Sequence, residues 1–479
     1  MLLTIDIGTS IFKSAVWDFE GGRKAFASVP LSINTTASPS SDNLRHETDS
    51  GQWLKAFEEC CKRLCVEIPL KNIEALVISG NGPSLTPVLT APHSLSSAPV
   101  RLWLDRRGEK AAEQVSLLLG SHVDAGFFLP KAFDIKINEP ELYEKTKYFL
   151  GCPEFFAFAL TGEARTVFPS DGFEHWYWND SILEKLELDK EKFPPFIRPG
   201  EIVGSLISQT AAQFGFKTDI PVIAGGPDFF PAILGAGAVK PGQICDRAGT
   251  SEGINLCTEN FISDKRLMCY GHPVKPYWNL SGIITTTGKA IEWGCRLLGI
   301  DNHSDFFALA EMADAGSGGL VFLPYLAGER APVWNPSARG MLRGLNLSAG
   351  RPEFARSILE GICFAIRDVI ETMEENNSGK TGTFAEELRI AGVSSGSILL
   401  NQLKADISGK PALVPKQKEA ELLGLAIIGS CTLGKYSSFT EAVSALVQIE
   451  KSFKPNKNNE ALYNDLFNLY QRSKKSCFQ

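Results

Sequence analysis

The sequence lacks three features that would assign it to a specialised class. It has no long run of basic residues and its net charge is −7, so nucleic acid is not expected as a main partner. No uninterrupted apolar stretch is long enough to cross a membrane, and Asp6 stands too early in the chain for a secretory signal peptide. We therefore expect a cytoplasmic protein that binds a small molecule, and neither nucleic acid nor a membrane.

The cysteines show no disulfide or metal-binding pattern. There are 11, at irregular spacings, and none forms a C-x-x-C pair. Cys60, Cys61 and Cys65 lie close together, but they fall on an amphipathic helix-like stretch without matching His or Cys nearby. We expect reduced thiols, with these three buried rather than bound to a metal.

The chain is long enough for two domains and carries a short internal repeat. At 479 residues it exceeds what one hydrophobic core supports. Asp6-Ile-Gly-Thr-Ser10 and Asp246-Arg-Ala-Gly-Thr-Ser251 each follow an apolar strand and precede a second strand, about half the chain apart. This placement predicts a duplicated domain, with residues 1–240 and 241–479 as the two copies.

A central stretch holds a candidate catalytic carboxylate. An apolar run, Ile220–Ala224, predicts a buried strand; Gly225 and Gly226 follow it, and Asp228 precedes a helix-like segment. Asp228 is therefore expected at the carboxyl end of a strand, where open α/β sheets place ligands. It is a candidate general base. It is also a good helix N-cap, which the local sequence slightly favours, and one residue can serve both roles.

The repeated Gly-Thr-Ser loops are candidate phosphate-binding loops. Glycine lets the backbone approach an anion closely, successive amides can point at it, and the hydroxyls add donors. Asp6 and Lys13 flank the first loop and would suit a magnesium shell and phosphate oxygens. One such loop is as well explained by a plain hairpin turn. Two of them with Asp228 between them favour phosphate chemistry.

Other candidate positions each have an ordinary structural explanation. Trp103 and Asp105 can wall a polar ligand, or be a core Trp and a surface Asp. The strand-to-helix turn at Gly392–Ser397 can hold adenine or ribose, or simply be a turn. The aromatic segment Phe173–Trp178 can be a lid, or packing.

Several longer motifs together resemble those of the FGGY carbohydrate kinases, which share the two-domain fold of actin and the hexokinases. The resemblance runs nearly end to end. It implies an α/β fold with two ribonuclease H-like domains and a cleft between them. The motifs are Gly340-Met-Leu-Arg-Gly-Leu345 with Glu353-Phe-Ala-Arg-Ser-Ile-Leu-Glu360, Tyr325-Leu-Ala-Gly-Glu-Arg-Ala-Pro332, Leu102-Trp-Leu-Asp105, Gly288 with Trp293, and Gln402 with Ala405-Asp406.

The resemblance also implies a reaction, transfer of the ATP γ-phosphate to a primary hydroxyl of a small sugar or polyol, most plausibly a pentulose such as xylulose or ribulose. Asp228 would be the base, and Asp6 and Asp228 would hold Mg²⁺. The first domain would carry the sugar side and the second the nucleotide side. ATP would contact Gly8, Thr9, Ser10, Lys13, Gly249, Thr250, Ser251, Gly288, Gly392, Val393, Ser394 and Ser397, and the sugar would contact Asn81, Gly82, Trp103, Asp105, Asp228 and Phe229.

The sequence departs from the family pattern mainly at the sugar and adenosine positions. Asn81-Gly82-Pro83 replaces the Gln-Met-His usual in xylulose kinases, and Gly392-Val-Ser-Ser395 replaces Gly-Gly-Gly-Ala. Pro227 and Phe229 stand where relatives usually have Gly and a polar amide. We expect a substrate that has fewer hydroxyls near Phe229 than xylulose, or that binds differently there. Two alternatives are a catalytically silent sugar- or nucleotide-binding regulator and an actin-like ATPase switch on the same fold. A homodimer is possible.

Overall fold

The computed structural model describes residues 1–37, 44–89, 96–120, 122–174, 176–375 and 383–476. It divides into two compact units. Unit 1 comprises Met1–Gly235 and Glu421–Leu446, and unit 2 comprises Ala236–Ala420 and Val447–Gln479. The segment Glu421–Leu446, from the second half of the sequence, therefore packs with the first half.

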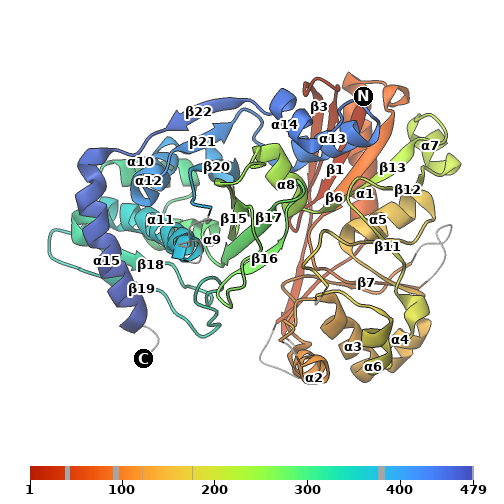
Figure 1. Cartoon of the computed structure of the whole chain (residues 1–479), viewed down its shortest axis with the longest axis horizontal. Coiled ribbons are helices and arrows are strands. Elements are labelled where there is room, and N and C mark those ends of the chain that lie inside the picture. The colour runs from red at the N-terminus through yellow and green to blue at the C-terminus, as the bar shows by residue number, and fades with distance from the viewer. Residues whose placement is uncertain (38–43, 90–95, 121, 175, 376–382, 477–479) are drawn as a thin grey trace. The chain divides into compact units, whose positions relative to one another are not determined.

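Unit 1 is built on a six-stranded mixed sheet (Figure 1). Its first three strands along the chain form an antiparallel meander, because short turns connect them. The later strands add to the other side of β1, where β1, β6 and β13 run parallel. The order across the sheet is β12 (Ile202–Ser205), β13 (Pro221–Pro227), β6 (Ala75–Gly80), β1 (Leu2–Ile7), β2 (Ile11–Trp17) and β3 (Arg23–Pro30).

Helices cover both faces of this sheet. Successive strand residues point to opposite faces. Leu3, Ile5 and Ile7 join the apolar core that contains α1 (Gly51–Glu67) and α5 (Cys152–Thr161). The opposite face, which carries Leu2 and Val77, lies against Gly429 of α13 (Ala420–Thr432). Asp6 shares the face of Leu2, so it points to the side of the sheet that α13 covers.

Unit 2 repeats this arrangement with a seven-stranded sheet. The strands β14, β20 and β21 are parallel, and an antiparallel series extends from β14. The pattern of parallel and antiparallel neighbours around β14 matches that around β1, as expected for a duplicated domain. The order is β16 (Met268–Gly271), β17 (Trp278–Ile284), β15 (Glu252–Thr258), β14 (Gln243–Ala248), β20 (Glu387–Gly392), β21 (Ala412–Pro415) and β22 (Ile449–Phe453).

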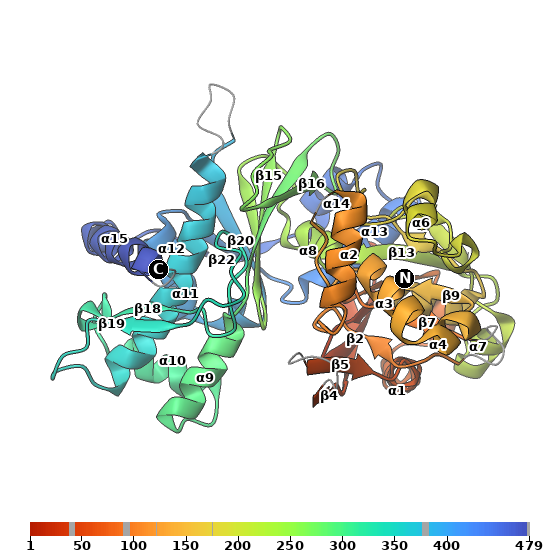
Figure 2. The ribbon, with the colours of Figure 1, turned by 90° about the horizontal axis from the view of Figure 1, so that it is seen from below.

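The core of unit 2 lies between its sheet and a group of helices. The long helix α11 (Arg351–Glu375) contacts β15 and β17, and α12 (Ile398–Ser408) contacts β21. The helix α12 also contacts α11 and α15 (Glu460–Ser476) (Figure 2). Ile244, Ile254 and Leu256 belong to this core.

The remaining elements connect these parts. In unit 1 they are β4 (Asn34–Ala37), β5 (Leu44–Thr48), β7 (Thr86–Val88), β8 (Val100–Arg101), α2 (Glu109–Leu119), α3 (Phe128–Asn138), α4 (Pro140–Lys145), β9 (Tyr148–Leu150), β10 (Thr166–Val167), α6 (Asp180–Lys185), β11 (Phe196–Ile197), α7 (Ser208–Phe214) and α14 (Phe439–Leu446). In unit 2 they are α9 (Gly288–Leu298), α10 (His303–Glu311), β18 (Val321–Leu323) and β19 (Met341–Arg343). The helix α8 (Phe229–Ala236) spans the boundary.

Two sequence-based expectations need correction. One lies in the stretch 142–161, which is mostly helical through α4 and α5 but also contains the strand β9, whose residues pair with β7 in a small antiparallel sheet. Cys65 was expected to be buried; it is exposed at the end of α1, whereas Cys60 and Cys61 are buried. The ten described cysteines are free thiols, and Cys477 lies outside the described residues.

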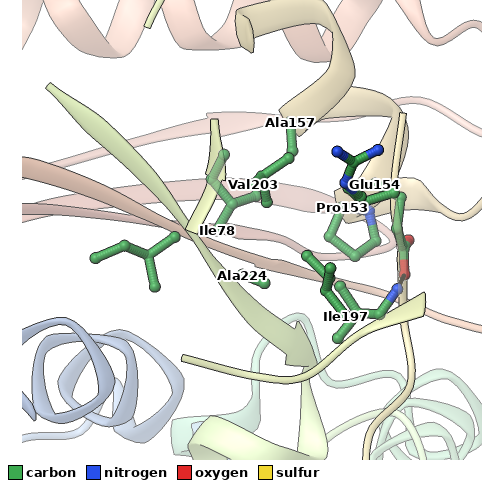
Figure 3. A pocket seen from close by; sticks show the side chains of 10 residues that line it. Ile78, Pro153, Glu154, Ala157, Ile197, Val203 and Ala224 are labelled. Atoms are coloured by element: carbon green, nitrogen blue, oxygen red, sulfur yellow. Dashed lines mark hydrogen bonds between the residues drawn. The ribbon is translucent and has the colours of Figure 1, made fainter. Parts of the chain in front are cut away.

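A small cavity lies in the core of unit 1, between β13 and the start of α5 (Figure 3). Its lining is mostly apolar, including Ile78, Ala157 and Ala224, but Glu154 also contributes. Burial raises the pKa of Glu154 to about 7. One carboxylate oxygen accepts a hydrogen bond from the Val167 amide at 3.2 Å.

No helix among the described ranges is long and apolar enough to cross a membrane.

Candidate functional site

The carboxyl end of β1 brings three polar side chains together. Asp6 on β1 pairs with Lys13 on β2 and with Ser79 on β6. The Ser79 hydroxyl donates to Asp6 Oδ1 at 3.0 Å. Asp6 is only 5% exposed. The turn predicted to start at Asp6 begins after Ile7, so Asp6 is held rigidly inside the strand.

Asp228 lies at the neighbouring strand end, as the sequence predicts. The strand β13 continues through both glycines to Pro227, with an irregularity in its pairing with β6 between Ala224 and Gly226. Gly226 has φ +84°, which favours glycine at this position. The Asp228 amide donates to the Gly80 carbonyl at 3.2 Å, which fixes the backbone of Asp228 against the end of β6. The ends of β1, β6 and β13 are therefore adjacent at one edge of the sheet.

The backbone of Asp228 also occupies the N-cap position of α8. Its carbonyl accepts the first helical hydrogen bond, from the Ala232 amide at 3.2 Å. A cap position and a position at the edge of the sheet are thus compatible, as the sequence analysis allowed.

A third carboxylate joins this site from the far end of the chain. Glu421, in the first turn of α13, raises the pKa of Asp6 by charge repulsion, and Asp228 adds to this effect. Burial is the larger cause, Lys13 opposes it, and the pKa of Asp6 reaches about 7. Sequence analysis missed Glu421 because an acid in the first turn of a helix is common, and nothing local ties it to a site 193 or more residues earlier.

The first Gly-Thr-Ser loop is the tight turn between β1 and β2. The Gly8 amide donates to the Ile11 carbonyl at 3.0 Å, and a side chain at Gly8 would approach the same oxygen to 2.8 Å. Glycine is therefore required at this position. The Thr9 hydroxyl accepts a hydrogen bond from the indole nitrogen of Trp103 at 3.0 Å. This bond joins a candidate phosphate residue to a candidate sugar residue within unit 1.

Asn81 lies close to Asp6, but its polar atoms are turned into the protein. It is 3% exposed, and its side-chain nitrogen donates to the Ile7 carbonyl at 3.0 Å. Its side-chain oxygen accepts from the Ser84 hydroxyl at 2.5 Å. Lys131 holds Pro83, two residues further along, by donating to its carbonyl at 2.6 Å. Asn81 therefore shapes the Asn81–Pro83 loop, in which Gly82 is exposed.

Asp105 is buried and ion-paired, not a surface acid. It is 1% exposed, and both of its oxygens accept from the Arg107 guanidinium at 2.6 to 3.1 Å. The His46 amide donates to Oδ2 at 3.1 Å. Burial disfavours the charged form, but Arg107 more than offsets it and the pKa of Asp105 is lowered. A carboxylate has about four acceptor positions, and these bonds occupy most of them.

Aromatic rings gather beside Asp228. Phe229 stacks on Phe173 with ring centroids 5.8 Å apart and an interplanar angle of 19°. Phe173 makes an edge contact with Trp176, with centroids 5.0 Å apart. Tyr177 and Trp178 are buried, which supports packing for this part of the Phe173–Trp178 segment. His175, included in the proposed lid, lies outside the described residues.

In unit 2 the candidate nucleotide segments converge. The Gly288 amide donates to the Gly249 carbonyl at 3.1 Å, and the Lys289 amide donates to the Thr250 carbonyl at 3.3 Å. On the other side, Ala248 pairs with Gly392. A side chain at Gly288 would meet the Gly249 oxygen at 2.3 Å, and one at Gly392 would meet the Ala248 oxygen at 2.1 Å. The backbones are therefore too close for anything but glycine.

A short 3₁₀ turn and the start of α12 follow Gly392. The turn spans Val393–Gly396, and the side chains of Val393 and Ser394 are outside the description. Ser397 is the N-cap of α12, and its hydroxyl accepts from the Leu400 amide at 3.2 Å. Gln402 donates to Asp406 Oδ1 at 2.6 Å and to the Lys454 carbonyl at 2.9 Å. The turn predicted at Gly392–Ser397 is therefore present. The Gln402 side chain links α12 to the backbone at Lys454.

Sequence analysis also missed a buried group of charges next to the second loop. Lys404 on α12 donates to Asp246 Oδ2 at 2.6 Å and to Glu252 Oε1. Burial, then repulsion by Glu252, raises the pKa of Asp246, whereas Lys404 keeps the pKa of Glu252 low despite burial. A Lys within an amphipathic helix ordinarily faces solvent, so its sequence gave no sign of burial.

Comparisons with known proteins agree with this geometry. The model of the N-terminal domain of the FGGY family of carbohydrate kinases matches residues 1–235, and that of the C-terminal domain matches residues 247–433. These matches cover most of the sequence. The chain belongs to the FGGY family of carbohydrate kinases, and it is a carbohydrate kinase, an enzyme class that uses ATP and acts on small sugars.

Relatives in this family act on more than one substrate. The xylulose kinase of Escherichia coli (strain K12) is 28% identical over 425 residues, covering 86% of this chain and 85% of that protein. The gluconokinase of Bacillus subtilis (strain 168) is 25% identical over 510 residues, covering 98% and 94%.

Solved structures confirm the predicted fold class of two actin- or hexokinase-type α/β domains. A gluconate kinase from Lactobacillus acidophilus superposes with a TM-score of 0.86 at 24% identity, covering 99% of this chain and 97% of that one. A xylulose kinase from the same organism gives 0.85 at 24% identity, covering 99% and 98%.

Proposed function

We propose that this kinase transfers the γ-phosphate of ATP to a primary hydroxyl of a small sugar or polyol, with a pentulose such as xylulose or ribulose as the acceptor and Asp228 as general base. The observation that carries the proposal is the position of Asp228. It lies at the end of β13, beside the end of β6. The next strand in the sheet, β1, carries Asp6 near its end and leads into the Gly8–Ser10 turn. An acceptor and a phosphate bound at this edge would meet at Asp228.

The proposed chemistry needs little covalent work by the protein. Phosphoryl transfer depends mainly on positioning and on neutralising charge. Asp228 accepts the proton of the attacking hydroxyl. The amides of Gly8–Ser10 and the ammonium of Lys13 bind phosphate oxygens in unit 1. The loops at Gly249–Ser251, Gly288 and Gly392–Ser397 bind the nucleotide in unit 2.

The carboxylates around Asp6 fit a hydrated divalent cation. Repulsion by Glu421 and Asp228 raises the pKa of buried Asp6, and a cation would relieve that repulsion. Across the described ranges, no group of three or more His, Cys, Asp or Glu side chains is arranged to ligate a metal directly. This suits Mg²⁺, which usually keeps several of its waters. Bound there, Mg²⁺ would neutralise phosphate charge, and Asp6 and Asp228 would hold it through water.

Replacing Asp228 tests the role of the base. Asp228→Asn keeps the shape and removes the basic oxygen, so kcat should fall by about 10²-fold or more. The Kd for ADP should change little, because the base acts on the acceptor. Asp180→Asn, an exposed acid in the first turn of α6, is the control and should keep wild-type kcat. A near-normal kcat in Asp228→Asn would remove Asp228 from the mechanism.

The acceptor should present an apolar edge next to the reacting hydroxyl. Phe229 directly follows the proposed base and is held by stacking on Phe173. The surface that its ring presents to the acceptor therefore offers no hydrogen bonds. A substrate hydroxyl placed against it would lose its water without gaining a partner. A panel of pentuloses, their deoxy analogues, gluconate and polyols, assayed by ADP release, identifies the acceptor. Best turnover of D-xylulose with a low KM would support a pentulose acceptor but contradict the predicted apolar edge beside Phe229. ATP hydrolysis unaffected by any sugar would favour a nucleotide switch.

A further inference from the structure

Lys404, Asp246 and Glu252 form a fully enclosed ion cluster in unit 2. Their side chains are 0%, 0% and 2% exposed, respectively. The Lys404 ammonium donates to Asp246 Oδ2 at 2.6 Å and to Glu252 Oε1. One cation therefore bridges two carboxylates.

The bridged carboxylates flank the second Gly-Thr-Ser loop. Asp246 lies on β14, three residues before Gly249, and Glu252 is the first residue of β15, directly after Ser251. Ala248 pairs with Glu252 across the hairpin. The Lys404 ammonium thus holds both strands of the hairpin immediately below the loop.

The same ammonium ties this hairpin to the second nucleotide segment. Lys404 lies on α12, which begins directly after the turn that follows Gly392. Gly392 in turn pairs with Ala248 on β14. The cluster therefore fixes α12, and the turn leading into it, against the hairpin that carries Gly249–Ser251.

Stability alone does not account for this cluster. Asp246 and Glu252 point to the same face of the sheet as Ile244 and Ile254, which belong to the apolar core. Apolar side chains of similar size in place of a buried ion cluster are often neutral or stabilising, because charges lose their hydration on burial. What the cluster adds is a geometrically specific connection between three elements.

We propose that Lys404 is a positioning residue for ATP: it does not touch the nucleotide but sets the spacing between the Gly249–Ser251 loop and the turn at Gly392–Ser397. This inference rests on the proposed function, in which both segments bind ATP. Small displacements of such groups have large effects on binding and rate.

The test compares Lys404→Met with a matched control, Arg356→Met. Arg356 makes a largely buried ion pair in unit 2, with its Nε 2.8 Å from Glu360 Oε1 on the same helix, α11. Both variants should lower the Tm. Only Lys404→Met should raise the Kd for ADP and the KM for ATP, by about tenfold or more, while the acceptor KM stays within about twofold. An equal change in nucleotide affinity in both variants contradicts the proposal.

A second variant distinguishes a positioning role of Lys404 from an effect of its loss on folding. Lys404→Met leaves two uncompensated buried acids, which can prevent folding. The triple variant Lys404→Met/Asp246→Asn/Glu252→Gln removes all three charges, so it should fold, and it should still bind ADP weakly because the bridge is gone. Wild-type ADP affinity in the folded triple variant overturns the positioning role alone. Failure of the wild type to bind ADP contradicts both this role and the proposed function.

Discussion

Asp6 is a buried acid whose charge at neutral pH depends on its neighbours. Burial and repulsion by Glu421 raise its pKa to about 7, while Lys13 and the Ser79 hydroxyl oppose the rise. At pH 6 only roughly a tenth of such a group is ionised. If ionised Asp6 is needed to hold Mg²⁺, kcat/KM for ATP should rise with pH between 6 and 8, because this ratio reports ionisations of the free enzyme.

Removing the charge of Glu421 should move this pH profile. Glu421→Gln lowers the pKa of Asp6, since a repelling carboxylate is lost, and shifts the acidic limb of kcat/KM to lower pH. The measurement is the position of the acidic limb from pH 5.5 to 8.5, not the height of the profile, because only the position reports the pKa of Asp6. Glu441→Gln, an exposed acid on α14, serves as the control. An acidic limb that stays in place would show that Asp6 does not control it.

Among single residues, Asp105 shows that a motif does not determine the burial or the partner of a side chain. The sequence offered a ligand residue or a surface acid, whereas the structure shows a buried acid bound to Arg107. Its partner is only two residues away, yet the bond depends on the chain turning back at that point. The proposed contact of Asp105 with the sugar remains a prediction.

At the scale of elements, close backbone contacts explain the glycines of the nucleotide site. A side chain at Gly392 would meet the Ala248 oxygen at 2.1 Å, and β14 would have to move. Gly392→Ala should therefore lower the Tm and weaken ADP binding. Gly409→Ala at the end of α12 is the matched control, because both glycines have positive φ but Gly409 has nothing within 4 Å.

Gly392→Ala and Gly409→Ala both strain the backbone, but only Gly392→Ala also creates a steric clash with a neighbouring strand. Forcing a side chain into the left-handed region costs about 1–2 kcal/mol in each. Only Gly392→Ala also displaces β14, the strand that leads into Gly249, so only it should affect ADP titrations. Equal ADP affinity in both variants would mean that the contact between β14 and β20 does not shape the nucleotide site.

Elements with strong local signals could be predicted from the sequence. The helix α12 follows from the sequence, because apolar residues at helical spacing come after Ser397 and Gly409 ends the helix. The position of Asp228 between β13 and α8 also follows from the pattern of an apolar run, two glycines and an acid. By contrast, the strand β9 could not be predicted, because its apolar residues suit either a strand or a helix.

Site residues that come from distant elements could not be predicted. Glu421 reaches Asp6 because α13 returns to cover the face of the first sheet that carries Leu2. Lys404 reaches Asp246 because α12 packs beside β14 and β20. Each pairing depends on tertiary packing across more than a hundred residues, about which local periodicity carries no information.

At the scale of the whole molecule, several buried acids make stability depend on pH. Asp6, Glu154 and Glu329 all have a pKa raised to about 7 by burial. The folded state therefore holds these protons more tightly than the unfolded chain does, and stability falls as pH rises from about 4.5 to 7. His272, whose pKa is lowered by burial to about 4, acts in the opposite direction between about 4 and 6.5.

Glu154 offers the cleanest test, since it lines the core cavity behind β13 (Figure 3). Glu154→Gln keeps an oxygen for the Val167 amide but cannot ionise. A shift from the usual 4.5 to about 7 corresponds to about 3 kcal/mol of lost stability above pH 7, and to much less at pH 5. The variant should therefore raise the Tm clearly at pH 8 and only slightly at pH 5, whereas Glu163→Gln, an exposed neighbour, should change neither. An equal change in Tm at both pH values would mean that Glu154 is already ionised in the folded protein, with Arg165, which lines the same cavity, as a candidate to hold its charge.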